Sequence, residues 1–298
     1  MKLNPYTPGA GVMPGYLSGR EKVIEEAKTN IFHLINGYPQ RPIIYYGLRG
    51  VGKTVLLNKI EEYAFLSDIL YCHIEVKEKT DLILELINES NIFLQELSNI
   101  EKIKSMLNKL KEAIDNLSIT YTGGDNSLTI NANKEFKNVV LSNNITKLFT
   151  TLGMLAKESN KAVIFFIDEI QYAKKDQLEA LISAQHRINQ LRLPISIFGA
   201  GLNKVLSMLT ISKTYAERMF LFREITSLSY EETKEAILKP IENMNLTFEE
   251  NALEEIYKIT EGYPYFVQEL CKTILDNIEN KNNITLEDVK NNIDIFNK

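Results

Sequence analysis

The sequence has only two cysteines and no long apolar run. Cys72 and Cys271 show no spacing typical of metal ligands, and so few cysteines are typical of a protein kept in a reducing cytoplasm. No stretch approaches the roughly 20 apolar residues that a membrane-spanning helix needs. The first residues, MKLNPYTPGAGVMPGY, also lack the apolar segment of a signal peptide. We therefore expect a cytoplasmic protein that does not contact a membrane.

Arginine is absent from the last quarter of the chain. No arginine follows Arg223, and from Thr226 onward fifteen Asp and Glu residues face seven lysines, a balance of −8. The chain before this point is slightly basic. An acidic segment repels the phosphates of nucleic acids, so we do not expect residues 226–298 to form a DNA-binding surface.

The bulk composition is that of a soluble globular protein. Hydrophobic residues make up 44% of the 298 residues and charged residues 24%, which is enough apolar sequence for a substantial core. This length favours one large domain or two domains of ordinary size.

The segment GLRGVGKT, residues 47–54, has the pattern G-x-x-x-x-G-K-[ST] of a phosphate-binding loop. It follows the apolar run PIIYY, which is typical of a buried parallel strand, and precedes VLLNKIEEYA, whose apolar residues recur at helical spacing. A strand, a glycine-rich turn and a helix are the setting that this pattern requires. We therefore predict a nucleotide-binding loop that contains Gly47, Arg49, Gly50, Val51, Gly52, Lys53, Thr54 and Val55.

The residue types of this loop suit the phosphates of ATP. Its glycines let the backbone curl so that N–H groups point inward, and the N-terminus of the following helix adds partial positive charge. Lys53 is expected to contact the β- and γ-phosphates, and Thr54 to bind Mg²⁺. The alternative is an ordinary glycine-rich turn with an exposed lysine, which the flanking strand and helix disfavour.

Two acids end the apolar segment AVIFFIDEIQYA. Residues 163–167 predict a buried strand, and Asp168 and Glu169 follow it directly. Because α/β sheets bind ligands at the carboxyl ends of their strands, Asp168 is predicted to hold Mg²⁺ and Glu169 to polarise the attacking water. Alone, such a pair would indicate only a strand that leaves the core. The phosphate-loop motif upstream favours a catalytic pair.

The remaining pattern predicts a parallel α/β core at residues 1–225, followed by a small helical lid at 226–298. Between residues 80 and 135 an insertion combines a long helical stretch with a β-hairpin about Gly123. Lysines of this insertion could contact nucleic acid, but the interleaved glutamates favour a solvated face. The further strands expected in the core are 68–76, 193–201 and 219–225.

Seven motifs resemble those of bacterial and archaeal AAA-type ATPases and occur in the same order: PYTPGAG, LSGRE, GLRGVGKTVLL, FFIDEIQ, GAGL, YAERMF and EGYPYFVQ. The resemblance spans nearly the whole chain, and it is to origin-recognition initiator ATPases and STAND signalling ATPases. The phosphate loop with GRE and IDE is specific for the broad class, and YAERMF with GYPYF narrows it to this group. The resemblance implies an AAA-like P-loop NTPase fold, with a parallel sheet core and a C-terminal all-helical lid.

The resemblance also implies contacts to the nucleotide from outside the phosphate loop. Gly19 and Arg20, with the loop before them, match residues that lie beside the adenine in this family. Pro264 is similar to the proline of the G-x-P element by which STAND lids contact the nucleotide. A proline there also suits the first turn of a helix, and both roles are compatible.

Two arginines resemble residues that sense the nucleotide or complete its site. Arg218 lies in YAERMF, and Arg223 follows shortly after. An arginine near the γ-phosphate offsets charge in the transition state and accelerates hydrolysis. The alternative is a structural ion pair, for instance between Arg218 and Glu217, and for Arg223 we favour this alternative.

Two departures from the family concern charge stabilisation. Many AAA proteins place a polar residue, often Asn, at the end of the fourth strand, whereas residues 198–201 read FGAG and Asn203 is the nearest substitute. Many also use an arginine from the lid, and this lid has none. Because both gaps reduce the electrostatic stabilisation of phosphate cleavage, we expect a slow ATPase whose bound state matters.

Three functions remain open. The favoured one is a nucleotide-dependent switch that hydrolyses ATP to ADP and phosphate with Mg²⁺ and is read by a protein partner or by self-association. The second is an initiator-like DNA-binding ATPase whose DNA-binding domain is absent from this chain. The third is an ATP-binding regulatory module for a partner protein, such as a toxin–antitoxin or defence component. Salt-dependent retention on DNA would indicate the second, and phosphate release separates the first from the third.

Overall fold

The computed structural model describes residues 3–97, 105, 108–115, 134–212, 216–278 and 281–296. The chain divides into two compact units, each made of segments that are distant in sequence. The phosphate-loop unit combines Met1–Glu25, Gly47–Lys59 and Glu224–Lys298. The sheet unit combines Glu26–Tyr46 and Ile60–Arg223.

A five-stranded sheet of order β2-β3-β4-β1-β5 forms the centre of the fold. The pairs β2–β3, β3–β4 and β1–β4 are parallel, as the sequence predicts. The register sets Tyr46 beside Gly201 and Glu75 beside Asp168, so the carboxyl ends of these strands share one edge. The five strands are β1 (Ile43–Tyr46), β2 (Leu70–Glu75), β3 (Val163–Asp168), β4 (Ile195–Gly201) and β5 (Leu221–Glu224).

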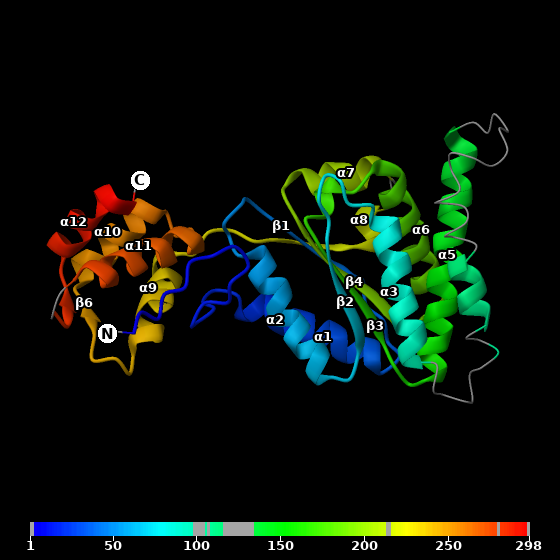
Figure 1. The fold of residues 1–298 in the computed structure, drawn as a ribbon, viewed down its shortest axis with the longest axis horizontal. Coiled ribbons are helices and arrows are strands. Elements are labelled where there is room, and N and C mark those ends of the chain that lie inside the picture. The colour runs from blue at the N-terminus through cyan, green and yellow to red at the C-terminus, as the bar shows by residue number, and fades with distance from the viewer. Residues whose placement is uncertain are drawn as a thin grey trace. The chain divides into compact units, whose positions relative to one another are not determined.

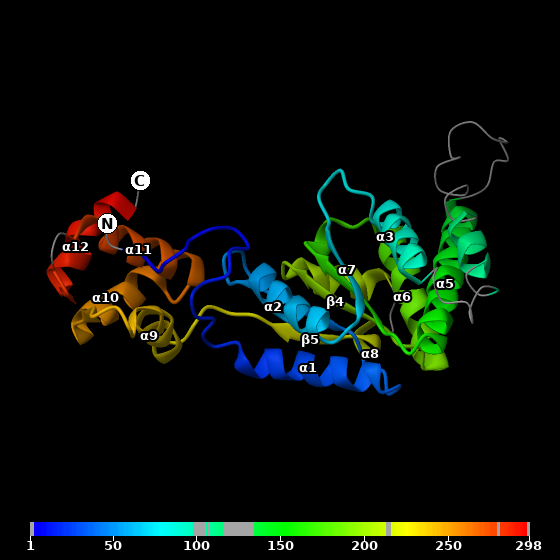
Figure 2. The same cartoon turned by 60° about the horizontal axis from the view of Figure 1, so that its bottom comes forward.

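Helices cover both faces of this sheet (Figures 1 and 2). α3, α5 and α6 lie on one face, and α1 lies on the other. The helices concerned are α1 (Glu21–Ile35), α2 (Lys53–Leu66), α3 (Leu82–Leu97), α5 (Lys134–Glu158), α6 (Lys175–Leu191), α7 (Lys204–Ser212) and α8 (Ala216–Met219).

The interior strand β3 is buried along its whole length, because apolar side chains occupy both of its faces. Phe165 stacks on Phe149 of α5 with 5.0 Å between ring centroids, and it also meets Phe93 of α3. On the opposite face, Phe166 packs against Phe198 of β4. Phe165 therefore packs the sheet against α3 and α5, while Phe166 packs within the opposite face of the sheet.

The insertion is helical from Leu82 onward over the part that the structure describes. α3 ends at Leu97, and residues 108–115 are helical as well. The hairpin predicted about Gly123 lies outside the described residues.

The lid is helical as predicted, apart from one short strand pair. β6 (Thr247–Phe248) pairs in parallel with β7 (Asn283–Ile284). Tyr6 of the N-terminal segment is buried in the lid core, and its hydroxyl donates to the carbonyl of Ile237 at 2.8 Å. The lid helices are α9 (Tyr230–Leu238), the 3₁₀ turn η3 (Lys239–Ile241), α10 (Glu250–Thr260), α11 (Pro264–Asn277) and α12 (Leu286–Phe296).

Across the described ranges, none of the helices combines the length and the apolar character that crossing a membrane would require.

Candidate nucleotide-binding site

The phosphate loop begins directly after β1, and α2 begins at Lys53. Gly50 and Gly52 have φ of 80° and 88°, a left-handed backbone that glycine adopts without strain. A Cβ atom on Gly47 would lie 2.1 Å from the carbonyl oxygen of Ile225. Gly50 and Gly52 are therefore favoured by their backbone conformation, and Gly47 is required because the backbone of Ile225 approaches it closely.

Lys53 is held inside the loop. Its Nζ donates to the carbonyls of Gly47 at 3.2 Å and Leu48 at 2.7 Å, and the residue is only 7% exposed. Lys53 is therefore not the exposed lysine of an ordinary turn. An ammonium group surrounded by a curled backbone is suited to an anion such as a phosphate.

The first turns of α2 contact the N-terminal segment. Asn58 Nδ2 donates to the carbonyl of Gly11 at 3.2 Å, and a Cβ atom on Gly11 would lie 3.2 Å from Thr54 Cγ2. Thr54 and Val55 are half-buried, whereas Arg49 is exposed. The N-terminal segment thus reaches the threonine that is predicted to bind Mg²⁺.

Arg20 bridges the phosphate loop and the start of the lid. Its guanidinium donates to the carbonyls of Val51 at 3.1 Å and Thr226 at 2.6 Å, and also to that of Gly19. Burial lowers the pKa of Arg20, and the negative charge of Glu232 opposes that shift. Because a buried guanidinium needs acceptors, these carbonyls fix the position of Arg20. The predicted place of Gly19 and Arg20 beside the adenine stays a prediction.

The lid helix α11 begins against the loop. Pro264 is its first residue, where the missing N–H costs nothing. The N–H of Tyr265 points to the carbonyl of Gly50 at 3.5 Å. Gly262, which precedes α11, has φ of 70°. A Cβ atom at this position would lie only 2.0 Å from the carbonyl oxygen of Leu228, so only glycine fits here. The segment predicted to contact nucleotide therefore lies beside the phosphate loop.

The predicted acids lie at the end of β3, in the sheet unit. Asp168 is 2% exposed, and its Oδ1 accepts the N–H of Glu169 at 2.7 Å. Glu169 has a left-handed backbone with φ of 53°. Its carboxylate accepts a hydrogen bond from Gln171 Nε2, and Gln171 Oε1 accepts the N–H of Leu202 at 3.0 Å.

The two predicted arginines differ in their surroundings. Arg218 is exposed in the short helix α8, and the side chain of Glu217 lies outside the described part. Arg223 forms an ion pair with Glu26, with Nε 2.7 Å from the carboxylate, in line with a structural role. Asn203 is exposed in the turn after β4.

A magnesium ion would depend on few protein ligands here. Among the described residues, no group of three or more His, Cys, Asp or Glu side chains is placed to hold a metal. Mg²⁺ at nucleotides is usually bound by one or two protein oxygens together with water and phosphate oxygens. The hydroxyl of Thr54, in the phosphate-loop unit, and the buried carboxylate of Asp168, in the sheet unit, are each a kind of oxygen ligand that Mg²⁺ accepts.

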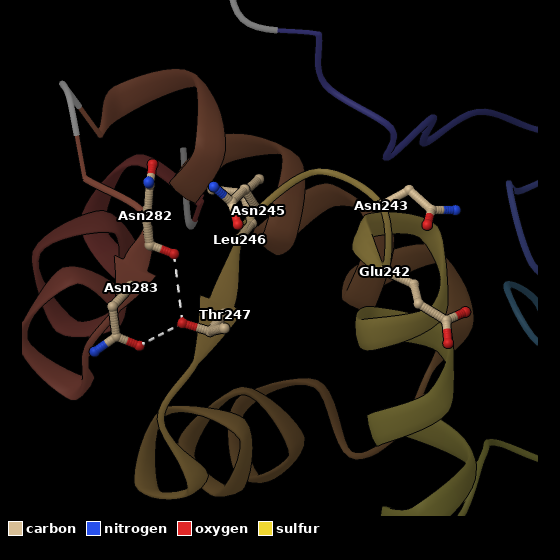
Figure 3. A pocket seen from close by; sticks show the side chains of 7 residues that line it. All are labelled: Glu242, Asn243, Asn245, Leu246, Thr247, Asn282 and Asn283. Carbon is tan, nitrogen blue, oxygen red and sulfur yellow. Dashed lines mark hydrogen bonds between the residues drawn. The ribbon is translucent and has the colours of Figure 1, made fainter.

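The lid also has an open hollow of about 580 Å³ (Figure 3), and no residue of the phosphate loop lines it. Thr247 donates to Asn282 and Asn283 within it. None of the seven described residues that line it carries a positive charge, so it does not suit phosphate. They are Glu242, Asn243, Asn245, Leu246, Thr247, Asn282 and Asn283.

Three residues that order the phosphate-loop unit or the end of β3 could not be recognised from the sequence. Gln171 stands in the quoted IDEIQ motif, yet only the fold shows its contact with Leu202. Asn58 has no distinguishing local pattern. Glu232 forms a capping box with Ser229, and the S-x-x-E spacing of that box is visible in the sequence.

Known proteins share this fold. Residues 39–142 match a family model described as an AAA domain. The RuvB Holliday junction branch migration motor of Thermotoga maritima is 17% identical over 96% of this chain and 73% of that chain, with a TM-score of 0.55. The Walker-type ATPase paby2304 of Pyrococcus abyssi is 16% identical over 94% of this chain and 72% of that chain, with a TM-score of 0.54.

A third similar structure is the Orc1 protein of Aeropyrum pernix in complex with DNA. It is 13% identical over 95% of this chain and 66% of that chain, with a TM-score of 0.51. Identities this low show the fold alone. No curated protein sequence matches the chain.

Proposed function

We propose that this chain, whose residues 39–142 match an AAA domain model, binds ATP and ADP with Mg²⁺ and hydrolyses ATP slowly, as a nucleotide-dependent switch. The observation that carries this proposal is the bridge made by Arg20, which bonds to Val51 of the phosphate loop and to Thr226 at the start of the lid. A ligand that reshapes the loop must act on a residue that is also bonded to the lid. Binding and lid position are therefore coupled.

Each proposed role follows from the chemistry of the side chain. Lys53 and the backbone N–H groups of the loop hold the phosphates, while Thr54 and Asp168 supply oxygens to Mg²⁺, which offsets charge on the phosphates. Glu169 polarises the attacking water by accepting its proton. Gly19 and the N-terminal segment lie near the adenine.

Slow turnover is expected because few positively charged or polar side chains are available to the phosphates. The lid has no arginine, and its Lys272 is paired with Asp276 in the same helix. The strand β4 ends in Gly201, which has no side chain to offer. With fewer positive groups around the transferred phosphoryl group, its transition state is less stabilised.

Titration calorimetry together with phosphate release tests the proposal. We expect saturable, Mg²⁺-dependent binding of ATP and ADP, and turnover below about 1 s⁻¹, the low end of typical enzymes. A chain that binds neither nucleotide contradicts the proposal. Binding without any phosphate release would leave only a regulatory module.

We further propose that a protein partner or a second copy of the chain responds to the switch. The balance of −8 over residues 226–298 disfavours DNA for this role, although the Orc1 structure contains DNA. Retention of the chain on DNA that weakens as salt rises would contradict this choice.

Replacing Pro264 by alanine should weaken ATP and ADP binding by similar factors. The start of α11 lies beside Gly50, at the base of the phosphate loop, and the lid brings no arginine to the γ-phosphate. Calorimetry with both nucleotides measures the two factors. If Pro264→Ala harms ATP binding alone, the lid reads the γ-phosphate and this account of the lid is wrong.

Replacing Arg218 by alanine should lower turnover and spare ADP affinity, since the proposed role of this exposed arginine is to offset charge near the γ-phosphate. Phosphate release and ADP titration measure the two effects. Arg187→Ala, which removes another exposed arginine of the sheet unit, is the matched control. Equal turnover of Arg218→Ala and wild type would remove Arg218 from the site.

A further inference from the structure

Gln171 connects Glu169 to the end of β4. It lies in the short 3₁₀ turn η2 (Ile170–Tyr172) and is 3% exposed. Its Oε1 accepts the N–H of Leu202 at 3.0 Å. Because a backbone N–H can only donate, this bond fixes the orientation of the amide and turns Nε2 toward the carboxylate of Glu169, to which it donates.

The end of β4 is shaped to accommodate this side chain. A Cβ atom on Gly201 would lie 2.7 Å from Gln171 Oε1 and 3.1 Å from Ile170 Cγ2. The carboxamide of Gln171 therefore occupies the space that a side chain at the end of β4 would need. A polar group from the turn after β3, bonded to Glu169 and Leu202, therefore lies at this strand end.

The bond to Gln171 uses only one oxygen of Glu169. Nε2 donates to Oε2, and within the described part of the chain Oε1 receives no hydrogen bond. A carboxylate held by one oxygen is restricted in its rotamers, and the other oxygen stays available to a water molecule.

We propose that Gln171 is a positioning residue that orients Glu169 toward the attacking water and anchors it to the end of β4 through Leu202. The proposal rests on the proposed function, in which Glu169 polarises that water. Gln171 contacts no reacting atom in this scheme, so its effect on hydrolysis passes entirely through Glu169.

A double-mutant cycle with Gln171→Met and Glu169→Gln tests this. Methionine has a similar length and offers no strong donor or acceptor. We expect Gln171→Met to lower kcat by about 10- to 100-fold, as a misplaced catalytic group does, with KM and ADP affinity within about twofold of wild type. In the Glu169→Gln background, Gln171→Met should lower kcat no further, because the group that it positions is already lost.

Two more variants make the test independent of one substitution. Gly201→Ala should also lower kcat, because its methyl group displaces the carboxamide from the other side. Gln171→Glu keeps an acceptor for the N–H of Leu202 and loses the donor to Glu169. If Gln171→Met does not fold, the kcat of Gln171→Glu is measured in its place and should be lowered as well. The exposed Gln190→Met is the matched control and should keep the wild-type kcat.

The outcomes separate this inference from the proposed function. A wild-type chain that releases no phosphate overturns both. A normal kcat in Gln171→Met overturns the inference and leaves the function intact. If Gln171→Met does not fold, a normal kcat in Gln171→Glu has the same meaning. A further loss of kcat in the Glu169→Gln background also overturns it, because Gln171 would then act by another route.

Discussion

Lys53→Ala abolishes nucleotide binding and leaves the chain folded. The ammonium group of Lys53 bonds to loop carbonyls, and Lys53 belongs to neither hydrophobic core cluster, so its truncation leaves the sheet and lid cores intact. Two charge-assisted phosphate contacts of about 1.5–3 kcal/mol each correspond to a loss of affinity of at least about 100-fold. Calorimetry with ATP and ADP measures the affinity, and thermal unfolding monitors the fold.

Lys59→Ala is the matched control, since Lys59 is an exposed lysine on the same helix, α2. It should bind both nucleotides like the wild type. Wild-type affinity in Lys53→Ala would show that this loop is not where the phosphates bind.

Glu169→Gln keeps ATP bound and lowers its hydrolysis by about 100- to 1,000-fold, within the usual contribution of a general base. The amide has the shape of the carboxylate but cannot take a proton from water. Its oxygen can still accept the hydrogen bond from Gln171. Affinity by calorimetry and phosphate release under saturating ATP give the two numbers.

Glu158→Gln removes an exposed carboxylate at the end of α5 and is the control for charge alone. Equal losses of binding and hydrolysis in Glu169→Gln would mean that Glu169 is structural or assists the metal. The catalytic role of the acid would then be wrong.

The sheet could be predicted from the sequence because its strands are continuous apolar runs. β3 reads VIFFID and is buried at every position, and β4 reads ISIFGAG with the same burial. Local patterns of this kind need no knowledge of distant residues. The phosphate loop could be predicted for the same reason, since its strand, glycines and helix are contiguous.

Contacts between distant segments could not be predicted in this way. Arg20 bonds to Val51 and Thr226, which are 31 and 206 residues away in the chain. Neither acceptor has a side-chain signature, because both contribute backbone carbonyls. Tyr6 likewise enters the lid core from the opposite end of the sequence.

The position of Gln171 illustrates why a missing residue is hard to interpret from sequence. The absence of a polar side chain at the end of β4 suggested a gap, with Asn203 as the nearest substitute. Asn203 is exposed, and the carboxamide near the strand end comes from the turn after β3. Only the packing of Gln171 against Gly201 connects these two observations.

Hydrogen exchange of residues 262–266 tests the coupling of nucleotide to lid most directly. These residues begin α11 beside Gly50, and the account predicts that ADP and ATP slow their exchange to a similar degree, together with that of the phosphate loop. Using Glu169→Gln with ATP keeps the triphosphate intact during the measurement. Protection of the loop with unchanged exchange at 262–266 would contradict the switch, because the lid would then not respond to the nucleotide.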